Sequence, residues 1–196
     1  MRLYLLRHAI TNHNVERRYQ GRGSDLKLTS EGIDQALKTS NYLKKFSIDV
    51  IYSSPLKRAL KTAEIINKHH NKKINIEPLI VERDFGILEG KKYEEVDYIT
   101  IREQGLYDIY QIEKKEDFQK RIMNFFNKLH KKHYSKNILI VSHGGAIKML
   151  LSNLQNIPWQ KGIYEIKKDN SSISIIDIDE NKQIKSIELN KIEHLN

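Results

Sequence analysis

The feature of this sequence that most constrains its fold is the alternation of short apolar runs with longer stretches of helical periodicity. Apolar runs bounded by turn or capping residues predict buried strands at 3–6, 50–52, 138–141 and 173–178, with a weaker one at 184–189. Between them, apolar residues recur three and four positions apart over 33–43, 56–66, 118–129 and 147–154. Strands that alternate with helices are joined by right-handed crossovers. The pattern therefore predicts an α/β fold, a three-layer α/β/α sandwich with a mainly parallel central sheet.

The length of the chain favours one domain. With 196 residues, 39% of them hydrophobic, it is long enough for one sizeable core and short for two. We therefore expect a single domain over 1–196, in which the aperiodic region 91–115 is an excursion that covers the active-site end of the sheet. Two helix starts are marked: Thr29 is a good N-cap, and Ser54 is an expected N-cap followed by Pro55 at the first helical position.

Composition limits the kinds of chemistry and partner. The chain has no cysteine, which excludes disulfides, thiolate catalysis and zinc–thiolate or iron–sulfur sites. Its net charge of +9 would suit nucleic acid, a membrane surface or a phosphorylated metabolite. Lysine pairs contribute much of that charge and are expected on the solvated surface; they lie at 44–45, 72–73, 131–132 and 167–168.

Other sequence features argue against two of these partners. No stacking aromatics are interleaved with the basic pairs, so we expect no nucleic-acid partner. No apolar run approaches about 18 residues, and the first residues lack the long apolar region of a signal peptide. We therefore expect a cytoplasmic protein with no membrane partner.

Polar residues that directly follow the predicted strands are candidates for a functional site, because open α/β sheets bind ligands outside the carboxyl ends of their strands. The first strand ends at Arg7 and His8, the second leads into Arg58, and the third predicted run leads into His143. Guanidinium groups match phosphate oxygens, and a neutral imidazole is a competent nucleophile toward phosphorus. Glu82 follows a short apolar run and is the best candidate for a general acid. Each residue alone also has a structural explanation, but their joint placement favours phosphoryl transfer.

At these residues the sequence resembles the histidine phosphatase (phosphoglycerate mutase-like) superfamily. The first strand ends in Arg7-His8-Ala9, where the family has Arg-His-Gly or Arg-His-Ala. The likeness continues in order through 11–14, 19–21, 28–36, 52–63, 82–90 and 141–145.

The resemblance implies catalytic and phosphate-binding residues. The catalytic set is His8, Glu82, His143, Arg7 and Arg58. Within it, His8 would be the nucleophile and Glu82 the proton donor. The phosphate-binding set is Arg7, Asn14, Gly21, Arg58, His143 and Gly144. No metal ion and no cofactor are implied.

The chain departs from the common family pattern beside the nucleophile. Where that pattern reads Arg-His-Gly-Glu-Thr, this chain has Ala9 and Ile10, so any hydrogen bonds of that glutamate are absent. Ile10 could reshape the wall beside His8, which leaves the fine specificity open.

The resemblance also bears on the kind of reaction. Mutases of the superfamily carry a longer, proline-rich insertion, and region 91–115 contains no proline, so water is expected to reach the phosphohistidine. The resemblance thus implies a metal-independent hydrolase of a small phosphorylated metabolite, of the phosphosugar, phosphoglycerate, ribazole phosphate or phosphoserine type. A phosphoglycerate mutase-type phosphotransferase and a catalytically weak module that binds phosphate esters are the alternatives. A homodimer stays open.

Overall fold

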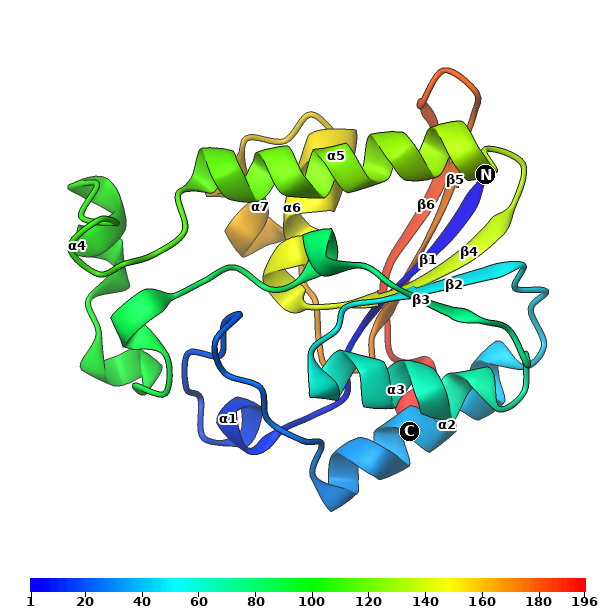
Figure 1. Cartoon of the computed structure of the whole chain (residues 1–196), viewed down its shortest axis with the longest axis horizontal. Helices are drawn as coiled ribbons and strands as arrows, with labels where there is room; N and C mark the ends of the chain where they lie inside the picture. Colours follow the sequence, from blue (N-terminus) through cyan, green and yellow to red (C-terminus); the bar gives the residue numbers. More distant parts are fainter.

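A six-stranded sheet runs through the molecule in the order β3-β2-β4-β1-β5-β6 (Figure 1). The computed structural model describes residues 1–196. Its strands are β1 (Arg2–Arg7), β2 (Val50–Ser53), β3 (Ile74–Ile76), β4 (Asn137–Ser142), β5 (Ile173–Ile178) and β6 (Ile184–Lys191). The first four pair in parallel, whereas β5 is antiparallel to β1 and β6 to β5. The predicted mainly parallel α/β sheet is therefore confirmed, and its last two strands form an antiparallel pair.

Helices cover both faces of this sheet. The α-helices are α1 (Asn12–Val15), α2 (Ser30–Leu43), α3 (Lys57–Asn67), α4 (Tyr98–Glu103), α5 (Lys115–His133), α6 (Gly144–Leu154) and α7 (Trp159–Glu165). Short 3-10 helices are η1 (Pro78–Ile80), η2 (Gly86–Leu88), η3 (Tyr93–Glu95) and η4 (Glu193–Leu195). In Figure 1, α2 and α3 lie on one side of the sheet and α5, α6 and α7 on the other. No helix is apolar enough over a sufficient length to cross a membrane.

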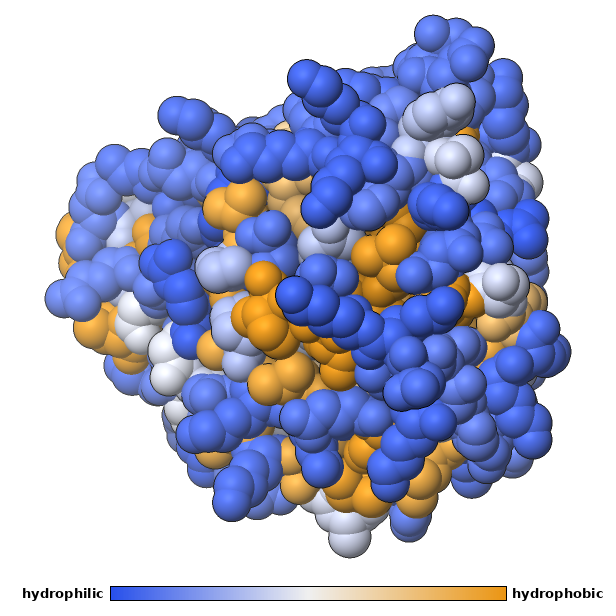
Figure 2. Space-filling model, turned by 45° about the vertical axis from the view of Figure 1, so that its right-hand side comes forward, coloured by the Kyte–Doolittle hydropathy of each residue, from blue (hydrophilic) through white to orange (hydrophobic).

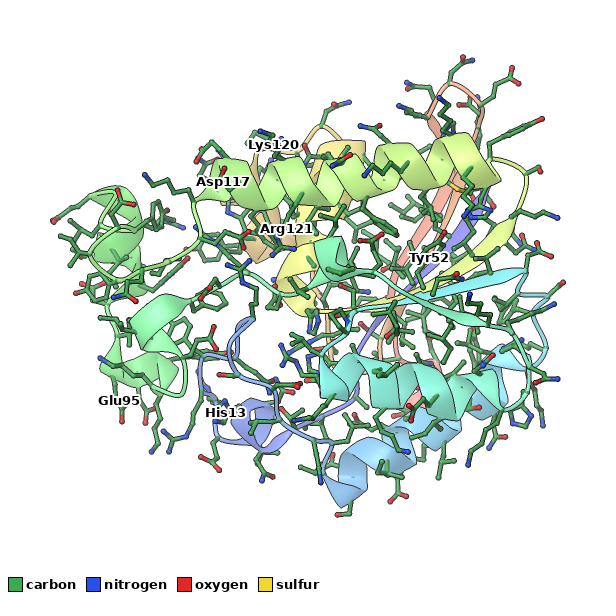
Figure 3. The ribbon with its side chains drawn as sticks, in the orientation of Figure 1. His13, Tyr52, Glu95, Asp117, Lys120 and Arg121 are labelled. Atoms are coloured by element: carbon green, nitrogen blue, oxygen red, sulfur yellow. The ribbon has the colours of Figure 1, made fainter.

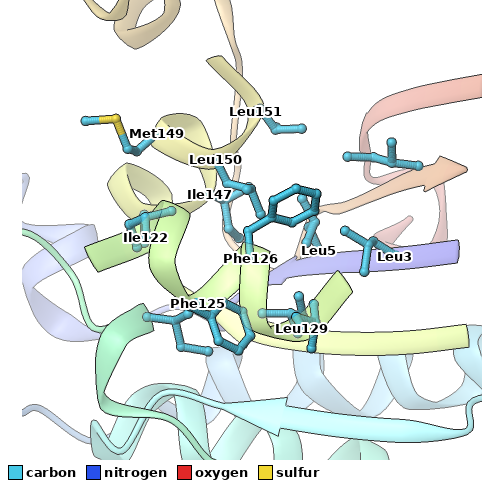
Figure 4. Packing of buried hydrophobic residues seen from close by; sticks show 14 of the residues in the cluster. Leu3, Leu5, Ile122, Phe125, Phe126, Leu129, Ile147, Met149, Leu150 and Leu151 are labelled. Atoms are coloured by element: carbon cyan, nitrogen blue, oxygen red, sulfur yellow. The ribbon is translucent and has the colours of Figure 1, made fainter. Parts of the chain in front are cut away.

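The two faces of β1 belong to two separate cores, because successive side chains of a strand point to opposite faces. Leu3 and Leu5 join the core beneath α5, α6 and α7, whereas Tyr4 and Leu6 join the core beneath α2 and α3. Figure 4 shows the first of these cores, in which Phe126 of α5 packs between the strand and the leucines of α6. Burial on both faces fixes the register of β1, and with it the position of the residues that follow the strand.

One of the two predicted helix starts is correct. Thr29 precedes α2, and its Oγ1 accepts a hydrogen bond of 3.0 Å from the backbone N–H of Gly32. The prediction for Ser54 and Pro55 was wrong, because α3 begins at Lys57. The Ser54 hydroxyl lies 2.8 Å from a ring nitrogen of His143 and also accepts a hydrogen bond of 3.3 Å from the backbone N–H of Leu56, so the residue links the site to the start of α3.

The region 91–115 contains η3 and α4 and lies at one end of the molecule (Figure 1). Ile101 and Ile112 of this region form a small core with Tyr19 and Leu88. Apolar contacts with residues outside the region therefore hold it against the rest of the domain. In the view of Figure 2 most of the molecular surface is hydrophilic, with apolar residues exposed between the charged ones.

Candidate active site

A cavity of about 360 Å³ lies at the carboxyl ends of β1 and β4. The two strands are parallel neighbours, so their carboxyl ends meet at one edge of the sheet. The sequence predicted a site at this edge. The lining residues are Arg7, His8, Asn14, Tyr19, Gln20, Glu82, Phe85, Tyr93, Tyr98, Gly144, Gly145, Lys148, Ile163 and Lys168. The wall thus combines cationic and amide side chains with aromatic ones.

The imidazole of His8 is buried and held in one orientation. Its Nδ1 lies 2.8 Å from the carbonyl oxygen of Ala9. A carbonyl only accepts hydrogen bonds, so Nδ1 carries the proton and Nε2 keeps a free lone pair. Burial, together with the positive charges of Arg58 and Arg7, lowers the pKa of His8 well below its ordinary value. The ring is therefore neutral at physiological pH, which is the state that a nitrogen nucleophile needs.

Arg7 brings an incompletely satisfied guanidinium to the cavity. One terminal nitrogen donates to the carbonyl oxygen of Lys168 at 2.6 Å, while Nε is buried without any partner in the protein. Gly144 lies beside this group, since a Cβ built on Gly144 would be 3.4 Å from Nε of Arg7. A buried donor without an acceptor is costly, so its position on a cavity wall points to an anionic ligand.

Arg58 and His143 lie together behind His8 and do not line the cavity. The Nε of Arg58 donates to Nδ1 of His143 at 3.2 Å, and its terminal nitrogens donate to the carbonyl oxygens of Ser24 and Gly21. Nδ1 of His143 is therefore the acceptor, and its protonated Nε2 donates to the Ser54 hydroxyl.

The environment of this pair sets its charge. Burial lowers the pKa of Arg58 to about 10, so the guanidinium stays charged at neutral pH. Burial and the charge of Arg58 lower the pKa of His143 well below its ordinary value. The rings of His8 and His143 lie 5.2 Å apart, and the charge of Arg58 is close enough to lower the pKa of both histidines.

Glu82 enters the cavity from the segment that follows η1. Its two carboxylate oxygens accept hydrogen bonds of 2.8 Å from the backbone N–H groups of Arg83 and Gly145. A Cβ built on Gly145 would lie 2.4 Å from one of these oxygens, so only glycine leaves room for the carboxylate. The start of α6 thus fixes Glu82 on the same wall as His8.

Arg121 of α5 secures the backbone that carries Glu82. Its guanidinium donates to the carbonyl oxygens of Leu79, Val81 and Glu82 at 2.7 to 2.9 Å. It also forms an ion pair of 2.7 Å with Glu113, in which the two side chains are only 13% and 8% exposed. Figure 3 shows Arg121 on the side of α5 that faces the rest of the molecule, with Lys120 on the outer side.

Amide side chains complete the polar wall. Oδ1 of Asn14 accepts hydrogen bonds from the backbone N–H of Thr11 and from the amide of Asn170, which leaves its own NH2 group for a ligand. The amide of Gln20 bonds Thr11 through one end, and its other end is buried without a protein partner. Asn170 also donates to the carbonyl oxygen of His8, which ties the loop before β5 to the nucleophile.

The structure separates the predicted site residues into two groups. The cavity is lined by Arg7, His8, Asn14, Glu82 and Gly144. The others stand behind this wall, namely Arg58, His143 and Gly21. Gly21 touches the site through its carbonyl oxygen on Arg58, and a Cβ there would lie 2.3 Å from Glu89.

The sequence interpretation missed several residues of the cavity wall. Lys168 was expected on the solvated surface as half of a lysine pair, but it is only 6% exposed and lines the cavity, whereas Lys167 is exposed. The expectation for Lys168 was wrong because buried and exposed residues alternate along the irregular segment 166–169 after α7. Lys148 lies on the first turns of α6, four residues after Gly144. This spacing puts the two residues on the same helix face and could have identified Lys148 as a site residue.

These groups together can carry out phosphoryl chemistry. A neutral imidazole nitrogen lies beside unpartnered donors and buried positive charge, and a fixed carboxyl group shares the same cavity. This is the combination of nucleophile, charge clamp and acid that a phosphate monoester requires.

Comparison with known proteins gives consistent matches. The sequence profile of the histidine phosphatase superfamily (branch 1) matches residues 3–190. The chain is 39% identical to the uncharacterized phosphatase PhoE of Bacillus subtilis, over 76% of this chain and 75% of that protein. It is 30% identical to phosphoserine phosphatase 1 of Hydrogenobacter thermophilus, over 100% and 94% of the two chains. Its fold is similar to the solved structure of Bacillus stearothermophilus YhfR, with a TM-score of 0.87, 28% identity and coverage of 100% and 99%.

Proposed function

Since this chain belongs to the histidine phosphatase superfamily, we propose that it is a phosphomonoester hydrolase in which His8 carries the phosphoryl group between substrate and water. Its relatives include phosphatases at 30% identity and above, which supports hydrolysis of a small phosphorylated metabolite. The chemistry proposed here uses side chains alone and needs no metal ion.

One observation supports the proposal most strongly: donors without protein partners meet a nucleophilic nitrogen in one cavity. Nε of Arg7 and one end of the Gln20 amide are buried without partners. The NH2 group of Asn14 faces the same space, and Nε2 of His8 has its lone pair free. A phosphoryl group supplies the acceptor oxygens for these donors and the phosphorus atom for the imidazole.

In the first step, Nε2 of His8 attacks phosphorus and the bond from phosphorus to the alcohol oxygen breaks. The departing oxygen takes a proton from Glu82. In the second step, the Glu82 carboxylate accepts a proton from water while the water oxygen attacks the phosphohistidine. Inorganic phosphate leaves and His8 is regenerated. The carbonyl of Ala9, on Nδ1, stabilises the positive charge of the phosphorylated ring.

Arg58 and His143 have an electrostatic part in this proposal. All three guanidinium nitrogens of Arg58 already donate to the protein, so Arg58 acts through its positive charge from behind the cavity wall. His143 accepts a hydrogen bond from Arg58 and donates its own N–H to the Ser54 hydroxyl, which fixes the Arg58 guanidinium close to His8. Fixed and buried positive charge close to the reacting group stabilises the extra negative charge of the transition state.

Phosphate release from p-nitrophenyl phosphate and from a panel of alkyl phosphates, with and without EDTA, tests this function. We expect turnover that EDTA leaves unchanged. Activity abolished by EDTA would contradict the proposed chemistry. Binding of phosphate esters without any turnover would instead identify a binding module, and transfer of phosphate to a second hydroxyl compound in preference to water would identify a phosphotransferase.

A further inference from the structure

Two lysines share the active-site cavity although the proposed phosphoryl chemistry does not use them. Lys148 comes from α6, and Lys168 comes from the loop between α7 and β5. Lys168 is only 6% exposed, and Lys148 is half-buried. Fully buried lysines are rare unless an opposite charge accompanies them.

Neither lysine has a carboxylate partner. Nζ of Lys148 donates to the carbonyl oxygen of Ile163 at 2.6 Å, and Nζ of Lys168 donates to the hydroxyl of Ser174 at 3.0 Å. Both partners are neutral, and no acidic oxygen lies within 4.0 Å of either ammonium group. Asp169, the acidic residue next to Lys168, bonds Asn190 instead.

The positive charge of the site therefore exceeds what one phosphoryl group balances. The phosphoryl group of a monoester carries nearly two negative charges at neutral pH, which Arg7 and Arg58 balance. Glu82 is the only acidic residue on the cavity wall, and in the proposed first step it carries a proton and therefore no charge. The charges of Lys148 and Lys168 remain uncompensated.

We propose that Lys148 and Lys168 form a second anion subsite, which binds a carboxylate or a second phosphate on the alcohol part of the substrate. This inference rests on the proposed function, because it assigns the substrate class of the same cavity: phosphomonoesters that carry a second acidic group. The cavity has room for it, since about 360 Å³ lies within the range of small-molecule sites and exceeds the space of a phosphoryl group alone.

The surroundings of Lys168 make the subsite sensitive to pH. Burial and the charge of Arg7 lower the pKa of Lys168 to about 7, while Asp169 acts in the opposite direction. Lys148 is the other titratable cation of the subsite, and burial lowers its pKa too. Lys168 is charged below pH 7 and loses its charge above it. Preference for a second acidic group should therefore weaken as the pH rises through 7.

The subsite is tested by substrates that differ only in the second group. 3-Phosphoglycerate and glycerol 3-phosphate differ by a carboxylate in place of a hydroxymethyl group. Fructose 1,6-bisphosphate and fructose 6-phosphate test a second phosphate in the same way. At pH 6.5 we expect kcat/KM for at least one acidic member to exceed that of its partner about tenfold, as one charge-assisted hydrogen bond provides. The pair that shows the preference identifies the group.

Substitutions locate the preference. Lys148→Met and Lys168→Met should each lower the ratio of kcat/KM within the preferred pair by about tenfold. Lys167→Met is the matched control, because Lys167 neighbours Lys168 but is exposed and lies outside the cavity. Its ratio should equal that of the wild type. In the wild type the ratio should fall between pH 6 and 8, and Lys168→Met should remove that fall.

A ratio near one for both pairs in the wild-type enzyme would overturn the subsite, even if a lysine variant failed to fold. A ratio that Lys148→Met and Lys168→Met leave unchanged would also overturn it. Turnover of p-nitrophenyl phosphate separates this result from failure of the proposed function. If that ester is hydrolysed while both ratios are near one, only the subsite is wrong; if no ester is hydrolysed, the proposed function is wrong.

Discussion

Replacing Arg121 by methionine should destabilise the protein strongly, although Arg121 does not line the cavity. The side chain bonds three backbone carbonyl groups and the carboxylate of Glu113. Methionine keeps much of the apolar length of arginine but removes all of these donors. The substitution leaves Glu113 as a charge whose side chain is only 8% exposed.

The magnitude follows from that burial. Removal of one partner from a buried ion pair costs about 3–5 kcal/mol, because the remaining charge has no compensation. For a domain of this size, each kcal/mol lowers Tm by about 2–4 °C. The Tm of Arg121→Met should therefore lie about 6–20 °C below that of the wild type. The carbonyl of Glu82 also loses its donor, so kcat for alkyl phosphates should fall in the protein that remains folded.

Thermal unfolding followed by circular dichroism measures this effect. Lys120→Met is the matched control, since Lys120 is the neighbouring residue on α5, is exposed and points outward (Figure 3). Its Tm should stay close to that of the wild type, because exposed charges contribute little to stability. Arg121→Lys should fall between the two, because lysine keeps the charge but loses the planar fork. Equal Tm values for Arg121→Met and Lys120→Met would refute the reasoning.

Three further predictions concern the site. Burial and the charges of Arg58 and Arg7 hold the pKa of His8 well below 6.5. As the pH falls below about 6.5, His8 therefore binds a proton in the unfolded chain but not in the folded chain. The free energy of unfolding, measured by urea titration, should then decrease toward acid pH. Between pH 6 and 5 this decrease should be smaller for His8→Asn than for the wild type, and the difference between the two slopes should be up to about 1.4 kcal/mol per pH unit. Equal slopes would contradict the neutral imidazole. Glu82→Gln should lower kcat about 10²–10⁴-fold for alkyl phosphates and much less for p-nitrophenyl phosphate, whose leaving group needs little protonation; equal losses with chemistry rate-limiting would make Glu82 a positioning residue. Gly145→Ala should show the same dependence on the leaving group, because its Cβ would displace the carboxylate of Glu82. If steady-state kinetics gave the same ratio of kcat for alkyl phosphates to kcat for p-nitrophenyl phosphate as in the wild type, the displacement would be tolerated.

The sequence was most informative where a strand leads directly into the site. Arg7 ends β1 and His8 follows it. Both faces of this strand are buried, so the position of these residues was predictable from the apolar pattern. Glu82 was predictable for a similar reason, since it follows an apolar run that packs beneath α5. Strand β3 was missed because it has only three residues, none of them buried.

Side-chain direction away from the strands was not predictable. Lys168 and Lys167 look equivalent in the sequence, and only the path of the irregular segment after α7 decides which of them is buried. The donors of Arg58 are taken by the carbonyl groups of Gly21 and Ser24, which are far from it in the sequence. Likewise, the Arg121–Glu113 pair depends on how α5 packs against the segment before Glu82, which local periodicity does not encode.

Direct detection of phosphohistidine on His8 tests the central proposal most directly. Rapid mixing of the enzyme with a 32P-labelled phosphomonoester, followed by a quench in alkali, preserves a phosphorus–nitrogen bond for mass-spectrometric mapping. The account predicts a label that is stable to alkali, labile to acid and mapped to His8, and no label in His8→Ala. The fraction of enzyme molecules that carry the label depends on the rates of the two steps. A label that persists in His8→Ala, or turnover in that variant at the wild-type rate, would contradict the account.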